Sequence, residues 1–178
     1  MKKLLVLFIL SMFISCSINK KTTMKKQDFK FRTEYHQFYL EDKDNSEKVK
    51  DFWTDEALKE RLGLVKGGIA VSTESYGLIK GEIEILEKPN INTDYSKYDH
   101  VVEGGINIQS GELQILECPS SHVELSLKVV PGKYRVRVYS SNLKSVIDDD
   151  GDDYYRIELW KSDDMERKVL KQYEYKEQ

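Results

Sequence analysis

Residues 123–138 read VELSLKVVPGKYRVRV, and this stretch decides the fold class of the chain. Apolar side chains occupy the odd positions of residues 123–129, and the even positions are polar. After Pro131-Gly132 the alternation continues through residues 134–138, where the even positions are apolar. Proline fixes φ and glycine accepts a positive φ, so Pro131-Gly132 suits a type II turn. A period of two is that of a strand with one buried face. The stretch therefore predicts a β-hairpin with residues 134–138 as its return strand.

Stretches of the same kind lie on both sides of this hairpin. Tyr76-Gly77 separates two of them and predicts a second hairpin. About eight short strands predict a mainly β fold, an antiparallel β-sandwich with one short helix. The charged tail at residues 165–178 is compatible with a strand or a helix. The other expected strands cover Phe29 to Tyr39 (apolar at Phe29, Phe31, Tyr35 and Tyr39) and residues 69–75, 78–86, 101–108, 112–118 and 154–160.

A single short helix is expected at residues 54–62. Thr54 can cap its start, because a threonine oxygen accepts a hydrogen bond from a free N–H of the first turn. Two acidic residues follow Thr54 and suit the positive end of the helix dipole. Leu58 and Leu62 keep helical spacing, and Gly63 can end the helix.

The first 15 residues have the layout of a secretion signal. Lys2 and Lys3 precede an apolar run, and small residues follow it. The run is shorter than the roughly 20 residues that span a bilayer. Phe13-Ile14-Ser15-Cys16 resembles the lipobox of bacterial lipoproteins, which implies cleavage before Cys16 and a lipid on its thiol. An ordinary cleaved signal with an incidental cysteine, or an uncleaved anchor, would have a similar sequence.

These features predict three segments. Residues 1–15 form the signal peptide, residues 16–27 a lipid-anchored tether, and residues 28–178 a single β-sandwich domain. We therefore expect the domain in the cell envelope, held on the periplasmic or outer side of a membrane by its lipid. With Cys16 lipidated, Cys118 has no partner for a disulfide, and its apolar, strand-like surroundings predict a buried thiol.

The charge of the chain is unevenly distributed. Residues 1–26 contain six lysines and no acidic residue, so residues 27–178 carry 22 basic and 31 acidic residues, a net charge of −9. An acidic domain repels nucleic acid, whose binding depends on neutralising phosphates. The expected partner is a basic protein, and no direct contact with nucleic acid is expected.

The densest charge lies in Asp148-Asp149-Asp150-Gly151-Asp152-Asp153. With Gly151 at position six of an EF-hand loop, positions one and twelve would be Val146 and Ile157, so the EF-hand spacing fails. Three interpretations remain: a solvated hairpin tip, a looser calcium loop, or an acidic finger that binds a basic partner. The aspartates concerned are Asp148, Asp149, Asp150, Asp152 and Asp153.

The sequence contains no catalytic or cofactor motif. HExxH, CxxC, GxSxG and a phosphate-binding glycine loop are all absent. His36, His100 and His122 share no spacing typical of metal ligands. We expect a protein that is not an enzyme and has no cofactor, unless the acidic run binds calcium.

Five segments, taken in order, resemble the competence protein J family over about residues 28–160. The family is typified by an inhibitor of a DNA-entry nuclease, so the resemblance implies a non-enzymatic protein that binds and silences a nuclease. The leading hypothesis is a lipid-anchored nuclease inhibitor or immunity-type protein. The alternative is an envelope module that binds a small ligand, calcium or a glycan. The segments are Tyr35-His36-Gln37-Phe38, Phe52-Trp53-Thr54-Asp55-Glu56-Ala57, Ile69-Ala70-Val71, Glu103-Gly104-Gly105-Ile106-Asn107-Ile108 and the hairpin from Leu127 to Tyr139.

Overall fold

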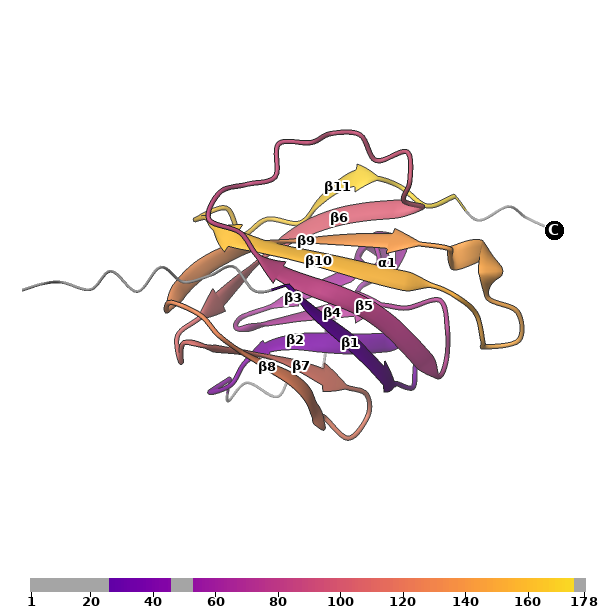
Figure 1. Ribbon diagram of the computed structural model, residues 1–178, viewed down its shortest axis with the longest axis horizontal. Helices are drawn as coiled ribbons and strands as arrows, with labels where there is room; N and C mark the ends of the chain where they lie inside the picture. Colours follow the sequence, from indigo (N-terminus) through magenta and orange to yellow (C-terminus); the bar gives the residue numbers. More distant parts are fainter. Residues whose placement is uncertain (1–25, 46–52, 175–178) are drawn as a thin grey trace, which may run out of the picture.

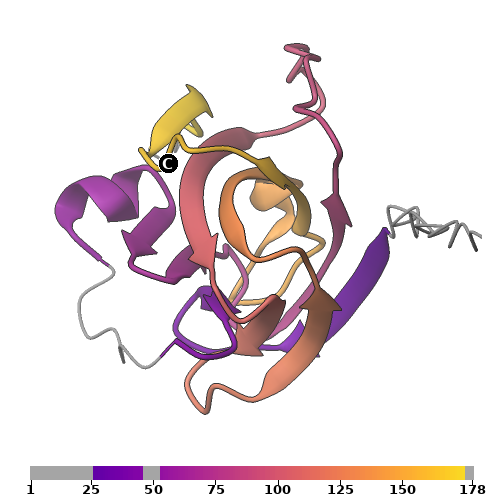
Figure 2. The same ribbon diagram turned by 90° about the vertical axis from the view of Figure 1, so that its left-hand side faces the viewer.

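Two β-sheets packed face to face make up most of the structure, a computed structural model that describes residues 26–45 and 53–174 (Figures 1 and 2). The six-stranded sheet has the order β1-β5-β10-β9-β6-β11 and the five-stranded sheet the order β3-β4-β2-β7-β8. The first sheet contains β1 (Gln27–Arg32), β5 (Leu78–Ile85), β6 (His100–Ile108), β9 (Gly132–Ser141), β10 (Tyr154–Lys161) and β11 (Lys168–Lys171). The second contains β2 (Gln37–Asp42), β3 (Leu62–Val65), β4 (Gly68–Ser72), β7 (Glu112–Glu117) and β8 (Val123–Lys128).

The predicted fold class is confirmed: the protein is mainly β, with two sheets and one α-helix in the described residues. The strand pairs are antiparallel, except that β10 runs parallel to β5. The described residues contain eleven strands rather than about eight, because β3 was not predicted and the predicted first strand is two strands. The tail that the sequence left open between strand and helix contains β11.

The hairpin predicted at residues 123–138 is wrong in its pairing. β8 pairs with β7 in one sheet, and β9 pairs with β6 and β10 in the other, so Pro131-Gly132 connects the two sheets. Gly132 does have a positive φ of 137°. Tyr76-Gly77 likewise connects β4 to β5 in the opposite sheet. Alternation shows that a strand has one buried face, and both sheets bury a face in the same core. It does not show which strands are neighbours.

The first predicted strand is interrupted by a turn at residues 33–36. Tyr35 and His36 have φ values of 56° and 53°, and this turn carries the chain from β1 in one sheet to β2 in the other. The turn also shifts the alternation by one residue. Phe38 is therefore fully buried, whereas Tyr39 is only half-buried. A one-residue shift exchanges the two faces of a strand, which is why Tyr39 does not continue the pattern of Phe29 and Phe31.

The predicted helix is present but shorter than expected. α1 spans Asp55–Lys59, and the Thr54 hydroxyl accepts a hydrogen bond from the Ala57 backbone N–H at 3.1 Å, as a cap does. Arg61 has a φ of 56°, which ends the helical path, and Leu62 then begins β3. Leu62 is fully buried in the sandwich, so its spacing from Leu58 reflected the core and not a helix face.

The core lies between the two sheets and has an aromatic centre. The rings of Phe29, Phe31 and Tyr155, all from the six-stranded sheet, lie 5.8, 6.0 and 5.8 Å from that of Phe38 in the opposite sheet. Burial of each such side chain stabilises the fold by about 1.5–3 kcal/mol. Cys118 is buried, as predicted, and forms no disulfide with any described residue.

The predicted signal peptide and Cys16 lie outside the described residues, so the lipid anchor stays a prediction. Within residues 26–45 and 53–174, no helix has the length and apolar character that crossing a membrane requires.

Candidate functional site

Four connections converge at one end of the sandwich, on the right of Figure 1. They are residues 33–36 between β1 and β2, 73–77 between β4 and β5, 118–122 between β7 and β8, and 142–153 between β9 and β10. Backbone hydrogen bonds of 2.8–2.9 Å join them, from Thr33 N to Gly77 O, Glu34 N to Cys118 O, Thr73 N to His36 O and Tyr76 N to Asp149 O.

Tyr76 holds the exposed part of this end together. Its backbone N–H donates to Asp149, while its ring meets those of Tyr35 and His36 edge-on, with centroids 6.2 and 5.4 Å away. Its hydroxyl donates to Glu34 Oε2 at 3.3 Å. Partial burial and the Glu34 carboxylate raise the pKa of the Tyr76 hydroxyl, so it stays protonated as a donor.

We call this end the tyrosine–aspartate surface and define it as residues 34–36, Tyr76 and residues 147–150. Tyr35 is 62% exposed and Ile147 73% exposed, and Tyr76 is partly exposed beside them. Exposed aromatic and apolar side chains of this size, held by their neighbours, are typical anchors of protein interfaces. The carboxylates of Glu34 and residues 148–150 surround them and give the surface a negative charge.

The structure divides the acidic run into two parts. Asp153 is buried at 1% exposure, and its carboxylate accepts four hydrogen bonds. They come from Ser75 N (3.0 Å), Ser75 Oγ (2.5 Å), Glu74 N (3.3 Å) and the Tyr155 hydroxyl (2.6 Å). This carboxylate attaches the start of β10 to the β4–β5 connection, so it is not available to a partner.

The rest of the run is exposed. Asp152 forms an ion pair with Lys80 at 2.7 Å, which lowers the pKa of Asp152. The side chains of Asp148, Asp149 and Asp150 form no hydrogen bond or ion pair within residues 26–45 and 53–174. Of the five predicted site residues, these three are exposed and keep unpaired carboxylates within the described residues.

No group of three or more His, Cys, Asp or Glu side chains that could hold a metal ion is present in the described residues. Calcium binding by the acidic run stays a prediction that nothing in the structure tests.

Strained backbone gathers in the same surface. Tyr35, His36, Asp148 and Asp149 have φ values of 56°, 53°, 46° and 73°, in the left-handed region that side chains other than glycine rarely adopt. Such residues persist only where the surroundings fix them, and they cluster at functional sites. The surface is thus held in one conformation by the hydrogen bonds among the connections.

A second concentration of charge lies on the outer face of the six-stranded sheet, and its members are paired. Glu103 on β6 accepts hydrogen bonds from Arg135 and Arg137 on β9, at 3.0 and 2.6 Å. Glu158 on β10 is fully buried and accepts from the Tyr139 hydroxyl at 2.6 Å and from Arg156 at 2.7 Å. The alternation of residues 134–138 correctly predicted that Arg135 and Arg137 point away from the core, but it could not show that both are buried.

The sequence pointed to the acidic run and to the Tyr35-His36 segment, but not to the contact between them. Tyr76 makes that contact, and it lies about 40 residues from Tyr35 and about 70 from Asp149 in the chain. Its exposed aromatic ring beside a turn glycine is the one local signal that could have drawn attention to it.

Comparisons with known proteins give matches only at the level of structure. No protein-family model matches the chain, and no curated protein is significantly similar to it. ComJ of Bacillus subtilis, described as an inhibitor of the DNA-degrading activity of NucA, superimposes with a TM-score of 0.62 and 21% identity. The match covers 78% of this chain and 98% of ComJ. A second structure, crocagin biosynthetic gene J, has a TM-score of 0.47 and 17% identity over 77% of this chain and 98% of its own. The resemblance to the competence protein J family is thus confirmed in the fold.

Proposed function

We propose that this chain, which has the fold of ComJ, is a non-enzymatic inhibitor that binds a nuclease through its tyrosine–aspartate surface. The observation that carries the proposal is the composition of that surface. Two exposed tyrosines, fixed against each other, lie beside three aspartates whose carboxylates have no partner in the described residues.

The two kinds of side chain have different tasks in this proposal. A nuclease presents a basic cleft to DNA, so the carboxylates of residues 148–150 attract it and speed association. Tyr35 and Tyr76 then bury their rings in the interface and slow dissociation. Tyrosine loses little conformational entropy on binding, and the contacts of Tyr76 reduce that loss further.

The proposal extends to location. A lipid on Cys16 would hold the inhibitor in the cell envelope, where it would meet an incoming nuclease before that nuclease reached cytoplasmic DNA. This role is that of an immunity-type protein. Mass spectrometry of the chain from membranes, with Cys16→Ala as the unmodified control, tests the anchor separately from inhibition.

The central experiment measures DNA degradation by purified nucleases in the presence of the chain. NucA serves as a defined probe, alongside any nuclease encoded next to the gene of this chain. We expect inhibition with a dissociation constant below about 1 µM, weakening steeply as the salt concentration rises.

Two variants assign the effect to the surface. In the first, Asp148→Asn, Asp149→Asn and Asp150→Asn are combined, which should slow association about tenfold at low salt. In the second, Tyr35→Ala should weaken binding about 30-fold, mainly through faster dissociation. The matched control combines Asp44→Asn, Asp163→Asn and Glu166→Gln, which remove the same charge from exposed positions outside the tyrosine–aspartate surface.

Two results would contradict the proposal. One is the absence of both binding and inhibition at micromolar concentration with every nuclease tested. The other is equal loss of inhibition in the charge variant and in its control, because net charge alone would then account for the effect.

A further inference from the structure

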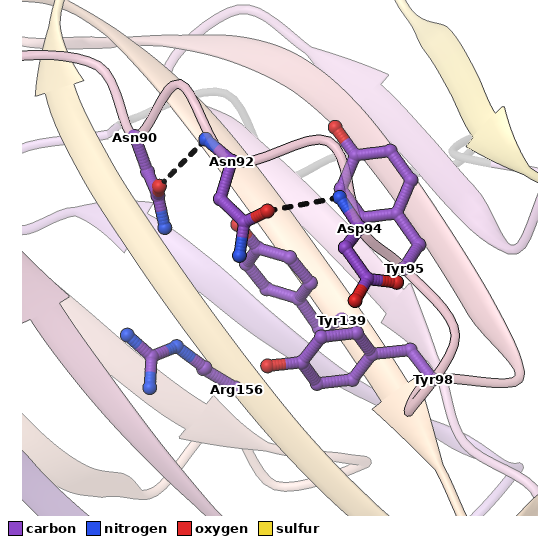
Figure 3. A pocket seen from close by; sticks show the side chains of 7 residues that line it. All are labelled: Asn90, Asn92, Asp94, Tyr95, Tyr98, Tyr139 and Arg156. Carbon is purple, nitrogen blue, oxygen red and sulfur yellow. Dashed lines mark hydrogen bonds between the residues drawn. The ribbon is translucent and has the colours of Figure 1, made fainter.

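A small pocket lies on the outer face of the six-stranded sheet, in a different region from the tyrosine–aspartate surface. The connection between β5 and β6 arches over β9 and β10 there and encloses about 180 Å³ (Figure 3). Pockets for drug-sized ligands occupy about 300–1,000 Å³, so this one has room for a single small ring.

The floor of the pocket is fixed by buried hydrogen bonds. The Tyr139 hydroxyl donates to Glu158 Oε2 at 2.6 Å, and the Asn90 side-chain amide donates to Glu158 Oε1 at 3.1 Å. The ring of Tyr98 packs against that of Tyr139, with centroids 4.6 Å apart. These bonds fix the floor, and the Glu158 carboxylate is fully paired within it. Tyr139 is only 3% exposed, so the half-buried ring of Tyr98 is the one that a ligand in the pocket would meet.

The wall is a chain of side-chain-to-backbone hydrogen bonds along the arching connection. Asn90 Oδ1 accepts from Asn92 N at 3.0 Å, Asn92 Oδ1 from Asp94 N at 2.9 Å, and Asp94 Oδ1 from Ser96 N at 3.0 Å. Each bond fixes one side-chain oxygen and with it the direction of the rest of the side chain. In Figure 3 the Asn92 amide nitrogen and the Asp94 carboxylate lie on the side that faces Tyr139 and Tyr98.

The lining offers both donors and acceptors but little net charge. Asn92 and the Tyr98 hydroxyl can donate, and Asp94 can accept. Hydrogen bonds from Ser96 lower the pKa of Asp94, so it is ionised at neutral pH. Arg156 supplies the opposite charge.

The surroundings disfavour charged ligands of either sign. Arg156 already pairs with Glu82 at 2.9 Å and with Glu158 at 2.7 Å, so an anion would have to compete with these carboxylates. A cation would be attracted by Asp94 but repelled by the guanidinium of Arg156, so the pocket offers it little net attraction. A neutral molecule that both donates and accepts hydrogen bonds, and that has an apolar face for the ring of Tyr98, meets neither obstacle.

A sugar ring has this chemistry: its hydroxyls donate and accept, and its C–H face packs on aromatic rings. We propose that this pocket binds the ring of a neutral monosaccharide, free or at the end of a glycan. Tyr98 forms the platform, supported from beneath by the buried ring of Tyr139, and Asn92, Asp94 and the Tyr98 hydroxyl contact the sugar hydroxyls.

The test is a titration of the ¹⁵N-labelled full chain, followed by NMR, with a panel of neutral hexoses, pentoses and N-acetylhexosamines. At least one sugar should give saturable shifts of Asn92, Asp94 and Tyr98, with a dissociation constant of about 0.1–10 mM. Tyr98→Phe and Asp94→Asn should each weaken binding about fivefold, the effect of one lost hydrogen bond. Asp148→Asn, on the tyrosine–aspartate surface, should leave the affinity unchanged.

Three outcomes would overturn the proposal. The first is the absence of saturable shifts with every sugar up to about 50 mM. The second is tighter binding of glucuronate or glucosamine than of the neutral sugars, since the pocket would then select charge. The third is unchanged affinity in both variants, which would place binding elsewhere. None of these outcomes bears on nuclease inhibition, so the two proposals fail independently.

Discussion

Acidic residues occur in two regions of this protein and are used in opposite ways. On the outer face of the six-stranded sheet, Glu103 and Glu158 are buried. Glu103 is paired with Arg135 and Arg137, and Glu158 with Arg156. On the tyrosine–aspartate surface, the carboxylates of residues 148–150 are exposed and have no partner in the described residues. The comparison shows that a net charge of −9 does not describe what a partner would meet. The buried acids are balanced by arginines that this sum already counts, whereas Asp148, Asp149 and Asp150 belong to the unpaired excess and remain exposed.

The largest loss of stability should come from removing one partner of the buried ion pairs on the outer face of the six-stranded sheet. Glu158→Ala would leave Arg156 with one carboxylate fewer and the Tyr139 hydroxyl without its buried acceptor. Removing one partner of a buried ion pair typically costs about 3–5 kcal/mol. We expect a loss of that order in the free energy of unfolding, measured with urea. A loss below about 1 kcal/mol would show that this face contributes as little as an ordinary exposed surface.

The next effect concerns a buried group that the fold holds neutral. His100 is fully buried, and burial lowers its pKa from 6.5 to about 4; the backbone carbonyl of Glu60, 3.0 Å from its Nε2, works against that shift. Between these values the unfolded chain binds a proton that the folded chain does not, so stability falls as the pH decreases from 6.5 towards 4.

The loss from His100 amounts to at most about 3 kcal/mol. The variant His100→Gln should show a flatter dependence of unfolding free energy on pH in this window. If wild type and variant had parallel curves, His100 would not be the group responsible.

A smaller effect on stability distinguishes the buried and exposed parts of the acidic run, when the same Asp-to-Asn change is made in each. Asp153→Asn would place an amide N–H against donors from Ser75 and Tyr155, at a cost of about 2 kcal/mol. Asp149→Asn is the same change four residues away, on an exposed side chain, and should stay within about 0.5 kcal/mol of wild type. Thermal or urea unfolding of the two variants measures the difference, and equal costs would contradict the division of the run.

The smallest effect on stability should come from the exposed aspartates of residues 148–150. Combining Asp148→Asn, Asp149→Asn and Asp150→Asn should change the free energy of unfolding by less than about 0.5 kcal/mol. If the chain binds a nuclease as proposed, the same variant should lose most of the salt dependence of that binding, because charges at the rim of an interface act on association. A change in stability without a change in binding would reverse the roles assigned to the two regions.

The sequence predicted the strands well and their partners poorly, for one physical reason. Alternation records a buried face, so β8, β9 and β10 could be located from residues such as Val136 and Ile157. Pairing depends on contacts between distant segments, so the crossing between sheets at Pro131-Gly132 had no local signal. The turn at Tyr35 and His36 contains no glycine or proline, and its positive φ values could not be anticipated.

The candidate site could be predicted in its parts but not in its assembly. The charge of the acidic run was visible, whereas the burial of Asp153 depends on Ser75 and Tyr155, which approach it only in the folded chain. The buried charges around Glu158 were missed because alternating arginines on a strand are usually solvent-exposed. The pocket beneath the β5–β6 connection combines three separate segments and has no sequence motif.

The direction of β1 has a geometric consequence for presentation. The strand starts at Gln27 and runs towards the tyrosine–aspartate surface, because Arg32 at its far end adjoins the connection that carries Tyr76 (Figure 1). Six residues of strand span about 20 Å. A lipid on Cys16 would therefore attach the opposite end of the domain to the membrane, and the tyrosine–aspartate surface would face away from the bilayer. The bilayer would restrict where the protein diffuses without shielding the surface that we propose binds a nuclease.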